Sequence, residues 1–156
     1  MTETVEIETV ETADVVCIRE GVIRSVLLIK RGDEPFAGSD ALPGGYVEAG
    51  EKKRKAAARE LGEETGVRVE PERLRKVGVY DKPGRDPRGP VRTTAYLVVM
   101  PSGTQATAGD DAAYARWVPV ADLQDLLEDP AGGGFAFDHG QILLDALRLS
   151  GDFPSN

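Results

Sequence analysis

The sequence contains one cysteine and no hydrophobic run long enough to cross a membrane. Cys17 is the only cysteine among 156 residues, so the chain has no internal disulfide. It lies in an apolar run, where we expect a buried small hydrophobic side chain. Every apolar run is shorter than the ~18 residues of a membrane helix, and the N-terminus is acidic where a signal peptide would be basic. These absences predict a cytoplasmic protein with no membrane partner.

Basic residues are scarce relative to acidic ones. The chain has 19 lysines and arginines against 27 aspartates and glutamates, which gives a net charge of −8. This charge argues against a nucleic-acid polymer as partner, because phosphate binding needs a basic face. It leaves open a small phosphate ester whose charge is balanced by a metal ion. The remaining composition, 40% hydrophobic and 29% charged, is typical of a globular domain.

The order of the predicted elements favours an α+β fold, with helices packed against a mixed sheet. Residues 13–156 are expected to form a single domain, whereas residues 1–12 fit either an edge strand or an acidic tail. Glu20-Gly21 predicts a hairpin turn, and residues 31–41 a polar loop. The apolar patterns predict strands over residues 13–19, 22–30, 74–81, 92–100 and 115–118, a further short strand at 67–70, and helices over 51–65, 119–128 and 137–149.

The helix expected over residues 51–65 carries its charges against the helix dipole. Its residues are mostly good helix formers, and Gly66 stands where a C-cap glycine belongs. The basic run 52–55 occupies the first turn, where the dipole disfavours cations. Acids occupy the last turn, where it disfavours anions: Glu60, Glu63 and Glu64. A sequence that breaks a local rule twice in one helix is expected to serve a site.

Glu60 and Glu64 are four residues apart, so they share a helix face and repel each other. Two carboxylates ~4 Å apart repel by about 4 kcal/mol at an effective dielectric near 20. Arg59 can pair with Glu63 across one turn, but no basic residue of the helix is expected to pair with Glu60 or Glu64. The simplest remedy is a hard divalent cation with oxygen ligands, Mg²⁺ or Mn²⁺.

The same stretch resembles the signature box of the Nudix hydrolases. Its spacing is Gly45, five residues, Glu51, seven residues, Arg59-Glu60-Leu61, one residue, Glu63-Glu64, one residue and Gly66-Val67. Every required position of the box is matched. The resemblance covers about residues 13–149 and implies the Nudix fold, an α/β/α sandwich with a mixed β-sheet.

The resemblance also implies a metal site. The implied ligands of Mg²⁺, with Mn²⁺ as the alternative, are the carbonyl of Gly45 and the catalytic carboxylates of Glu60, Glu63 and Glu64. Arg59 would orient the glutamates through its pairing with Glu63. Glu51 is implied to be a positioning residue, although the helix dipole explains an acid at this end of the helix equally well.

The loop of residues 82–90 contains three prolines and presents Arg85, Asp86 and Arg88. Arginine recognises phosphate through paired hydrogen bonds. On composition alone, these charges could simply solvate a surface hairpin. After a complete box, however, residues 80–89 resemble the loop of the ADP-ribose pyrophosphatase subgroup of Nudix enzymes. The resemblance implies that Arg85, Asp86 and Arg88 bind substrate, and that one of the two arginines clamps the phosphate that is not attacked.

Two adjacent carboxylates, Asp110 and Asp111, lie in the loop before Trp117. In similar enzymes an acid at such a place completes the metal site or acts as base, which makes Asp111 a candidate catalytic residue. The usual residue there is glutamate, and an Asx turn explains the aspartates equally well. His139, the only histidine, has no metal-type partner beside it in sequence, so a surface or packing role is expected. Asp138 before it is a candidate N-cap.

The resulting expectation is a Mg²⁺-dependent Nudix pyrophosphohydrolase that acts on a small nucleoside diphosphate derivative. The best candidate substrate is ADP-ribose, which would give AMP and ribose 5-phosphate. One alternative is a Nudix hydrolase that acts on nucleoside triphosphates, including damaged ones. Another is a non-enzymatic ADP-ribose sensor that regulates transcription, although such regulators often carry a degraded box. By analogy with similar enzymes, the chain could form a homodimer.

Overall fold

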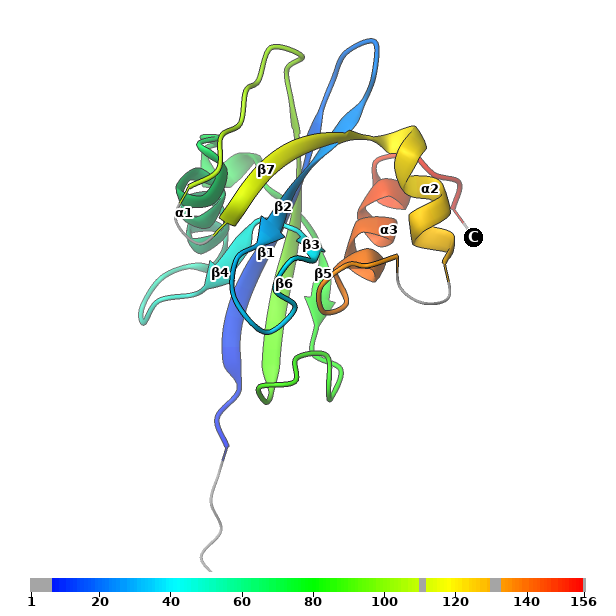
Figure 1. Cartoon of the computed structure of the whole chain (residues 1–156). Coiled ribbons are helices and arrows are strands. Elements are labelled where there is room, and N and C mark those ends of the chain that lie inside the picture. The colour runs from blue at the N-terminus through cyan, green and yellow to red at the C-terminus, as the bar shows by residue number, and fades with distance from the viewer. Residues whose placement is uncertain (1–6, 110–111, 130–132, 156) are drawn as a thin grey trace, which may run out of the picture.

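Seven strands form one mixed β-sheet with helices on both of its faces (Figure 1). The computed structural model describes residues 7–109, 112–129 and 133–155. The strands are β1 (Val10–Arg19), β2 (Ser25–Arg31), β3 (Asp40–Ala41), β4 (Gly44–Tyr46), β5 (Arg75–Tyr80), β6 (Val91–Met100) and β7 (Ala112–Pro119). The helices are α1 (Lys53–Thr65), α2 (Val120–Glu128) and α3 (His139–Leu149), with a short 3-10 helix, η1, at Pro71–Arg73. The predicted α+β class is confirmed.

The centre of the sheet is β1. It pairs in parallel with β6 over its whole length, from the Val10–Val91 pair to the Arg19–Met100 pair. The other pairings are antiparallel. The path of neighbouring strands runs β3-β2-β1-β6-β5, with β4 beside β1 and β7 beside β2. The sheet is therefore mixed, as the sequence predicted.

The strands β1 and β2 are joined by the predicted hairpin but diverge soon after it. They pair only beside the turn, at Ile18–Val26 and Arg19–Ser25. Further from the turn, β4 replaces β2 beside β1, and β3 replaces β1 beside β2. The short strands β3 and β4 follow each other in the chain, separated by Leu42-Pro43. Their connection therefore lies in the gap where the two long strands separate.

The alternation of side chains along β1 separates two hydrophobic cores. Val16 and Ile18 face the core under α2 and α3, whereas Val15 and Cys17 face the core under α1. Cys17 is fully buried, as expected, and burial raises the pKa of its thiol to about 12. The helices complete both cores with small and branched side chains: Ala56, Ala57 and Leu61 from α1, and Leu123, Ile142, Leu143, Ala146 and Leu147 from α2 and α3.

Several element ends differ from those expected. Residues 10–12 belong to β1, which therefore starts before Ala13. Residues 67–70 form no strand and lead into η1 instead. The expected polar loop of residues 31–41 contains β3, and β7 is longer than predicted. The first turn of α1 starts at Lys53 because the residue before it still has an extended backbone, with ψ 143°.

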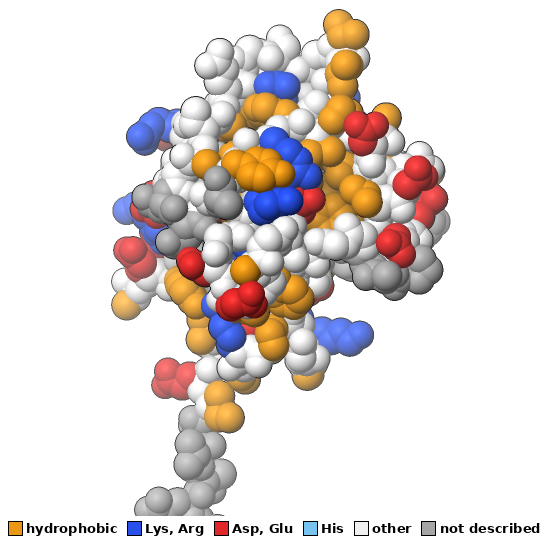
Figure 2. Space-filling model, in the orientation of Figure 1, with side chains coloured by type: hydrophobic (Ala, Val, Ile, Leu, Met, Phe, Trp, Pro, Cys, Tyr) orange, Lys and Arg blue, Asp and Glu red, His pale blue; other side chains and the backbone are white. Residues whose placement is uncertain are grey.

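Acidic side chains gather over α2 on the face shown in Figure 2, where Asp122, Asp125 and Glu128 are exposed. This agrees with the negative net charge of the chain. In the ranges that the structure describes, no helix combines the length and the apolar character that crossing a membrane requires.

Candidate active site

A cavity of about 330 Å³ opens where β1 and β2 diverge. Its walls come from both strands, the β3–β4 connection, α1, the loop of residues 82–90 and the start of α3. The charged lining residues and the histidine are Asp14, Arg31, Asp33, Glu34, Glu60, Glu64, Arg85, Asp86, Arg88 and His139. The cavity thus gathers most of the site residues that the sequence predicted.

Glu60 and Glu64 form the acidic wall of the cavity, beside the backbone of two glycines. A Cβ atom at Gly45 would lie 2.5 Å from the carboxyl carbon of Glu60, so this carboxylate packs directly against the Gly45 backbone. Glu64 Oε2 accepts a hydrogen bond from the Gly44 N–H at 3.3 Å. The structure therefore brings together three of the four predicted metal ligands: Gly45, Glu60 and Glu64.

Burial raises the pKa of Glu60, and repulsion by Glu63 and Glu51 adds to the effect, although Arg59 opposes it. The Nη1 of Arg59 donates to Glu60 Oε1 at 2.8 Å. The expectation that no basic residue of the helix pairs with Glu60 is therefore wrong, because the long arginine side chain bends to its own neighbour. A further cation beside Glu60 would still favour its charged form.

Arg59 connects three glutamates of the box. Its Nε and Nη2 donate to the two carboxylate oxygens of Glu51 at 2.9 and 3.0 Å. Its Nη1 also donates to Glu63 at 3.2 Å, which is the predicted pairing across one turn. Only 8% of the Glu51 side chain is exposed, and the Arg59 hydrogen bonds lower the pKa of Glu51 to about 2. This geometry supports a positioning role for Glu51.

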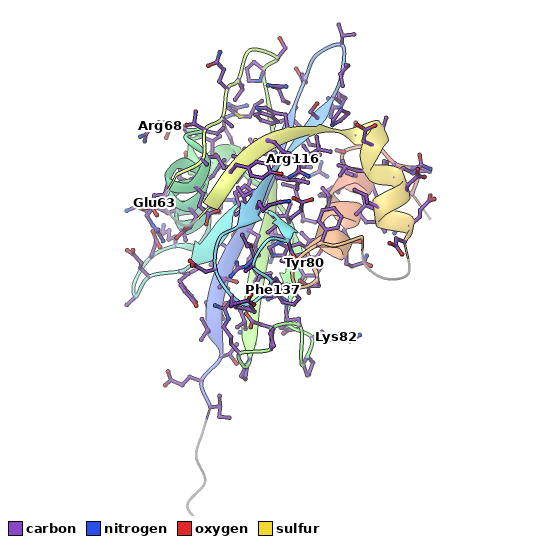
Figure 3. The ribbon with its side chains drawn as sticks, in the orientation of Figure 1. Glu63, Arg68, Tyr80, Lys82, Arg116 and Phe137 are labelled. Carbon is purple, nitrogen blue, oxygen red and sulfur yellow. The ribbon has the colours of Figure 1, made fainter. Side chains whose placement is uncertain are left out.

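Glu63 lies outside the cavity lining. It borders a separate depression with Arg59 and Arg68, and 45% of its side chain is exposed. Figure 3 shows Glu63 and Arg68 beside α1, well away from Phe137 in front of the sheet. Consecutive helical residues project about 100° apart, so Glu63 and Glu64 leave α1 in different directions. Arg59 nevertheless joins the Glu63 carboxylate to that of Glu60, so the role of Glu63 as the fourth ligand stays a prediction.

The loop of residues 82–90 supplies the basic wall. Arg85 is buried, with 4% of its side chain exposed, and donates to both oxygens of Asp138 at 2.6 and 2.9 Å. Asp138 stands at the predicted N-cap of α3 but makes no capping hydrogen bond there. Arg88 pairs with the buried Asp86 at 2.8 Å, yet 44% of the Arg88 side chain is exposed. Arg85 thus anchors the loop to α3, while Arg88 has surface left for a ligand.

Phe137 forms an aromatic part of the lining that the sequence did not predict. Its ring packs edge-on against Phe36, with centroids 4.9 Å apart. The guanidinium groups of Arg31 and Arg88 lie 5.0 and 5.7 Å from its centroid. Phe137 also has φ 52°, which is rare for a residue other than glycine. An apolar ring flanked by cations therefore lies in the same cavity as the acids.

Asp14 is a second lining residue that the sequence analysis missed. It is buried in β1, and its Oδ2 accepts a hydrogen bond from Thr93 at 2.6 Å. Burial raises the pKa of Asp14, but His139, the Thr93 hydrogen bond and Arg85 together bring it below its ordinary value. A signal was present in the sequence, because a single acid inside the apolar run 13–18 is unusual for a buried strand.

His139 lies inside the protein, at the edge of the cavity. Only 4% of the residue is exposed, and its Nδ1 accepts a hydrogen bond from the Leu42 N–H at 3.0 Å. Of the two roles expected for it, the surface position is wrong and the packing role is confirmed. Its partners, Leu42 and Asp14, are distant in sequence, so the residues beside His139 gave no indication that it lies at the cavity.

Asp110 and the predicted catalytic residue Asp111 lie outside the described residues, so the role of Asp111 stays a prediction. The residue before them, Gly109, is held at the end of α1. Its N–H donates to the Glu64 carbonyl at 2.8 Å, and a Cβ at this position would collide with the carbonyl oxygen of Glu63. The described part of this loop therefore packs on the helix that carries the acids.

The residues of the acidic wall fit a divalent cation of the magnesium type. The groups that could bind the cation there are the carboxylates of Glu60 and Glu64 and the backbone at Gly45, which offer hard oxygen ligands. Among the residues placed by the structure, no three acid, histidine or cysteine side chains are arranged to hold an ion by themselves. Magnesium needs no such cage, because it is usually bound through one or two carboxylates, with water and substrate phosphates as further ligands.

Comparison with known proteins identifies the family. The NUDIX domain model matches residues 9–136. The chain is 40% identical over 132 residues to an ADP-ribose pyrophosphatase of Methanocaldococcus jannaschii, an alignment that covers 83% of this chain and 71% of that protein. It is 38% identical over 122 residues to a putative 8-oxo-dGTP diphosphatase 2 of Mycobacterium tuberculosis, with 76% and 82% covered. The chain belongs to the Nudix family.

Solved structures confirm the fold. A MutT/nudix family protein from Enterococcus faecalis has a TM-score of 0.81 at 31% identity, covering 97% of this chain and 66% of that chain. The NUDIX domain of Shewanella oneidensis NrtR, solved with ADP-ribose, has a TM-score of 0.79 at 27% identity, covering 93% and 90%. The expected Nudix fold, with its mixed sheet between helices, is thus confirmed.

The family assignment defines the reaction class. As a Nudix hydrolase, this protein is a pyrophosphohydrolase that acts on phosphoanhydride bonds of nucleotides. Nudix enzymes typically use divalent metal ions. One similar structure, a bifunctional NMN adenylyltransferase/ADP ribose pyrophosphatase from Francisella tularensis, contains manganese and AMP. Its TM-score is 0.75 at 28% identity, over 92% of this chain and 42% of that chain.

The Arg59–Glu51 pair predicts a pH-dependent stability. The pKa of Glu51 falls from an ordinary 4.5 to about 2, so the pair stabilises the folded state above pH 4.5 and is lost as the pH falls toward 2. Glu51→Gln should lower the free energy of unfolding by about 2 kcal/mol at pH 7, the usual value for a hydrogen bond to a charged group. The difference from the parent should shrink steadily below pH 4.5. Urea unfolding in EDTA at several pH values measures it.

The exposed Glu72 in η1 supplies the control for this measurement. Glu72→Gln should leave the unfolding free energy within about 0.5 kcal/mol of the parent. A Glu51→Gln deficit that stayed constant down to pH 2 would contradict the pairing.

The contact between Gly45 and Glu60 predicts that a single methyl group added at Gly45 strongly lowers the activity. Gly45→Ala should displace the Glu60 carboxylate, and a misplacement of this kind lowers kcat/KM by about 100-fold. The unfolding temperature should change little, because the side chain of Glu60 can move. Gly103→Ala is the matched control, since no atom lies within 4 Å of its added Cβ. Equal activity of Gly45→Ala and Gly103→Ala would show that this contact is unimportant.

Proposed function

We propose that this protein is a Mg²⁺-dependent ADP-ribose pyrophosphatase that hydrolyses ADP-ribose to AMP and ribose 5-phosphate. One water is consumed, and one P–O bond of the phosphoanhydride is broken. The observation that carries the proposal is a cavity lined both by the acids Glu60 and Glu64 and by the partly exposed Arg88. A diphosphate that carries a substituent on each phosphate suits such a cavity, because its two phosphates can meet different walls.

The comparisons support this choice of substrate. The relative in Methanocaldococcus jannaschii is an ADP-ribose pyrophosphatase and is 40% identical to this chain. The similar NUDIX domain of NrtR was solved with ADP-ribose bound. Both findings concern other proteins, and they favour ADP-ribose over a dinucleotide or another nucleotide sugar as the first substrate to test.

The walls of the cavity supply the groups that the reaction needs. Glu60, Glu64 and the Gly45 carbonyl would hold Mg²⁺, with Mn²⁺ as the alternative. When bound, the ion supplies charge neutralisation and a lower pKa for a bound water. Arg59 keeps the acids oriented through its hydrogen bonds to Glu51 and Glu60. One of these carboxylates would also accept the proton of the attacking water.

The two arginines of the loop have different tasks in this proposal. Arg88 has an exposed guanidinium that can exchange Asp86 for a substrate phosphate, in the paired geometry that arginine favours. Arg85 stays with Asp138 and fixes the loop that presents Arg88. Phe137 offers an apolar face beside Arg88 for the ring of the nucleotide.

A second candidate is hydrolysis of nucleoside triphosphates, including damaged ones. The relative in Mycobacterium tuberculosis, a putative 8-oxo-dGTP diphosphatase 2, supports it. The basic wall alone does not separate the two candidates, because the phosphates of a triphosphate can also meet both walls. A non-enzymatic sensor is disfavoured by the intact box and by the buried acids that this box places in the cavity.

A substrate panel tests the proposal directly. The purified full chain is incubated with Mg²⁺ and ADP-ribose, dinucleotides, nucleotide sugars, 8-oxo-dGTP or ordinary nucleoside triphosphates. ADP-ribose should have the highest kcat/KM, with AMP and ribose 5-phosphate in equal amounts. Faster release of pyrophosphate from triphosphates would favour the second candidate, and no product from any compound would overturn both.

The acidic wall yields a prediction about single glutamates. Glu64→Gln should lower kcat by at least about 100-fold, since it removes a charged ligand of the cation from the cavity. Glu63→Gln should have a clearly smaller effect, because Glu63 lies outside the cavity lining. Steady-state kinetics with the best substrate and a Mn²⁺ titration measure both. A larger loss for Glu63→Gln than for Glu64→Gln would reverse these assignments.

A further inference from the structure

The buried pair of His139 and Asp14 connects the start of α3 to the glycine backbone of the cavity. His139 follows Phe137, the labelled residue in front of the sheet in Figure 3, by two positions. Its Nδ1 accepts a hydrogen bond from the Leu42 N–H at 3.0 Å. A backbone N–H can only donate, so Nδ1 carries no proton and the neutral ring bears its proton on Nε2. This contact therefore fixes the tautomer of His139.

The Nε2 proton of His139 faces Asp14. Nε2 lies 3.6 Å from Asp14 Oδ2, and both groups are almost completely buried. The same oxygen accepts a hydrogen bond from Thr93 at 2.6 Å, which holds the carboxylate from β6. Each ring nitrogen of His139 therefore has a protein group before it. His139 is consequently suited to holding the structure in place and not to exchanging a proton with substrate.

On its other side, Asp14 packs against the backbone that faces the acids. Asp14 pairs with Gly44 in the register of β1 and β4, and a Cβ at Gly44 would collide with Asp14 Oδ1. The Gly44 N–H donates to Glu64, and the next residue, Gly45, packs against Glu60. Residues 42–45 are thus held by His139 at one end and meet the two acids at the other.

The start of α3 is itself held against the strand that precedes this segment. The Ala136 N–H donates to the Asp40 carbonyl at 2.8 Å, and Phe135 forms a parallel bridge with Asp40. Arg85 binds Asp138 from the opposite side. His139 therefore projects from a backbone that is held on both sides, and its hydrogen bond adds a side-chain contact to the backbone pairings that hold residues 41–44.

We propose that His139 and Asp14 are positioning residues that hold residues 42–45, so that the Gly44–Gly45 backbone meets Glu60 and Glu64 in a preformed arrangement. The inference rests on the proposed function only in treating this arrangement as a cation site. Replacing a group that orients metal ligands typically changes metal affinity or activity by about 10–100-fold. Effects of this size should follow substitution of either residue of the pair.

Two substitutions of His139 separate its two contacts. His139→Asn keeps an oxygen near the position of Nδ1, so it can still accept from Leu42 but no longer reaches Asp14. His139→Gln places an amide nitrogen toward Asp14 but leaves no acceptor for Leu42. Thr93→Val removes the hydrogen bond to Asp14 without altering α3, and tests the pair if the His139 variants do not fold. Circular dichroism and the unfolding temperature identify the folded variants.

Amide hydrogen exchange of the metal-free full chain is the first measurement. Exchange at Leu42, Gly44 and Gly45 should be at least 10-fold faster in His139→Gln than in the parent, and within about threefold of the parent in His139→Asn. Thr93→Val should speed exchange at Gly44. Unchanged exchange in His139→Gln or Thr93→Val, or equal acceleration by Asn and Gln, would overturn the proposal, because only the volume of the side chain would then matter.

Mn²⁺ binding and kinetics form the second measurement. His139→Gln should weaken Mn²⁺ binding about 10-fold and lower kcat with little change in KM for ADP-ribose, whereas His139→Asn should largely restore both. A purely structural defect would not produce this split between kcat and KM. If the parent hydrolyses no substrate of the panel or binds no Mn²⁺, the proposed function fails, and the exchange measurement alone decides the role of the pair.

Discussion

The site depends on keeping two carboxylates of equal charge close together at the wrong end of a helix. The helix dipole disfavours both acids there, and the last turn of α1 contains no basic residue. The structure reduces this cost with a few donors, namely the guanidinium of Arg59 for Glu60 and the Gly44 N–H for Glu64. In the proposed function a divalent ion adds positive charge here, so the repulsion between the acids favours the binding of metal.

The fold makes room for these acids by letting two strands separate. Because β1 and β2 pair only near their turn, the β3–β4 connection can bring glycine backbone into the gap. Segments distant in sequence then close the cavity, and an ion pair and a buried hydrogen bond join them. Arg85 and Asp138 join the 82–90 loop to α3, and His139 joins α3 to Leu42. These contacts connect the 82–90 loop, α3 and the β3–β4 connection around the cavity.

Local pattern was enough to predict the helix of the box, most of the strands and the identity of the acidic wall. These features depend on periodicity and on spacing within a few residues. The signature implied that Glu63 is a ligand, and no local pattern predicted that it lies outside the cavity lining. The contacts of Asp14, Arg85 and His139 could not be predicted from local pattern. The two residues that each of these hydrogen bonds joins are 53 to 97 positions apart in the sequence. Such pairs become visible only when the topology is known.

The parallel partnership of β1 with β6 has a consequence for synthesis of the chain. The central strand leaves the ribosome first, but its full-length neighbour begins at Val91, about 80 residues later. At 5–20 residues per second this interval lasts roughly 4–16 s. During that time the backbone N–H and C=O groups on that edge of β1 lack their partner strand, and its apolar side chains lack the finished cores. The nascent chain must therefore shield its future centre, by early collapse or by a chaperone, until the second half of the sheet has emerged.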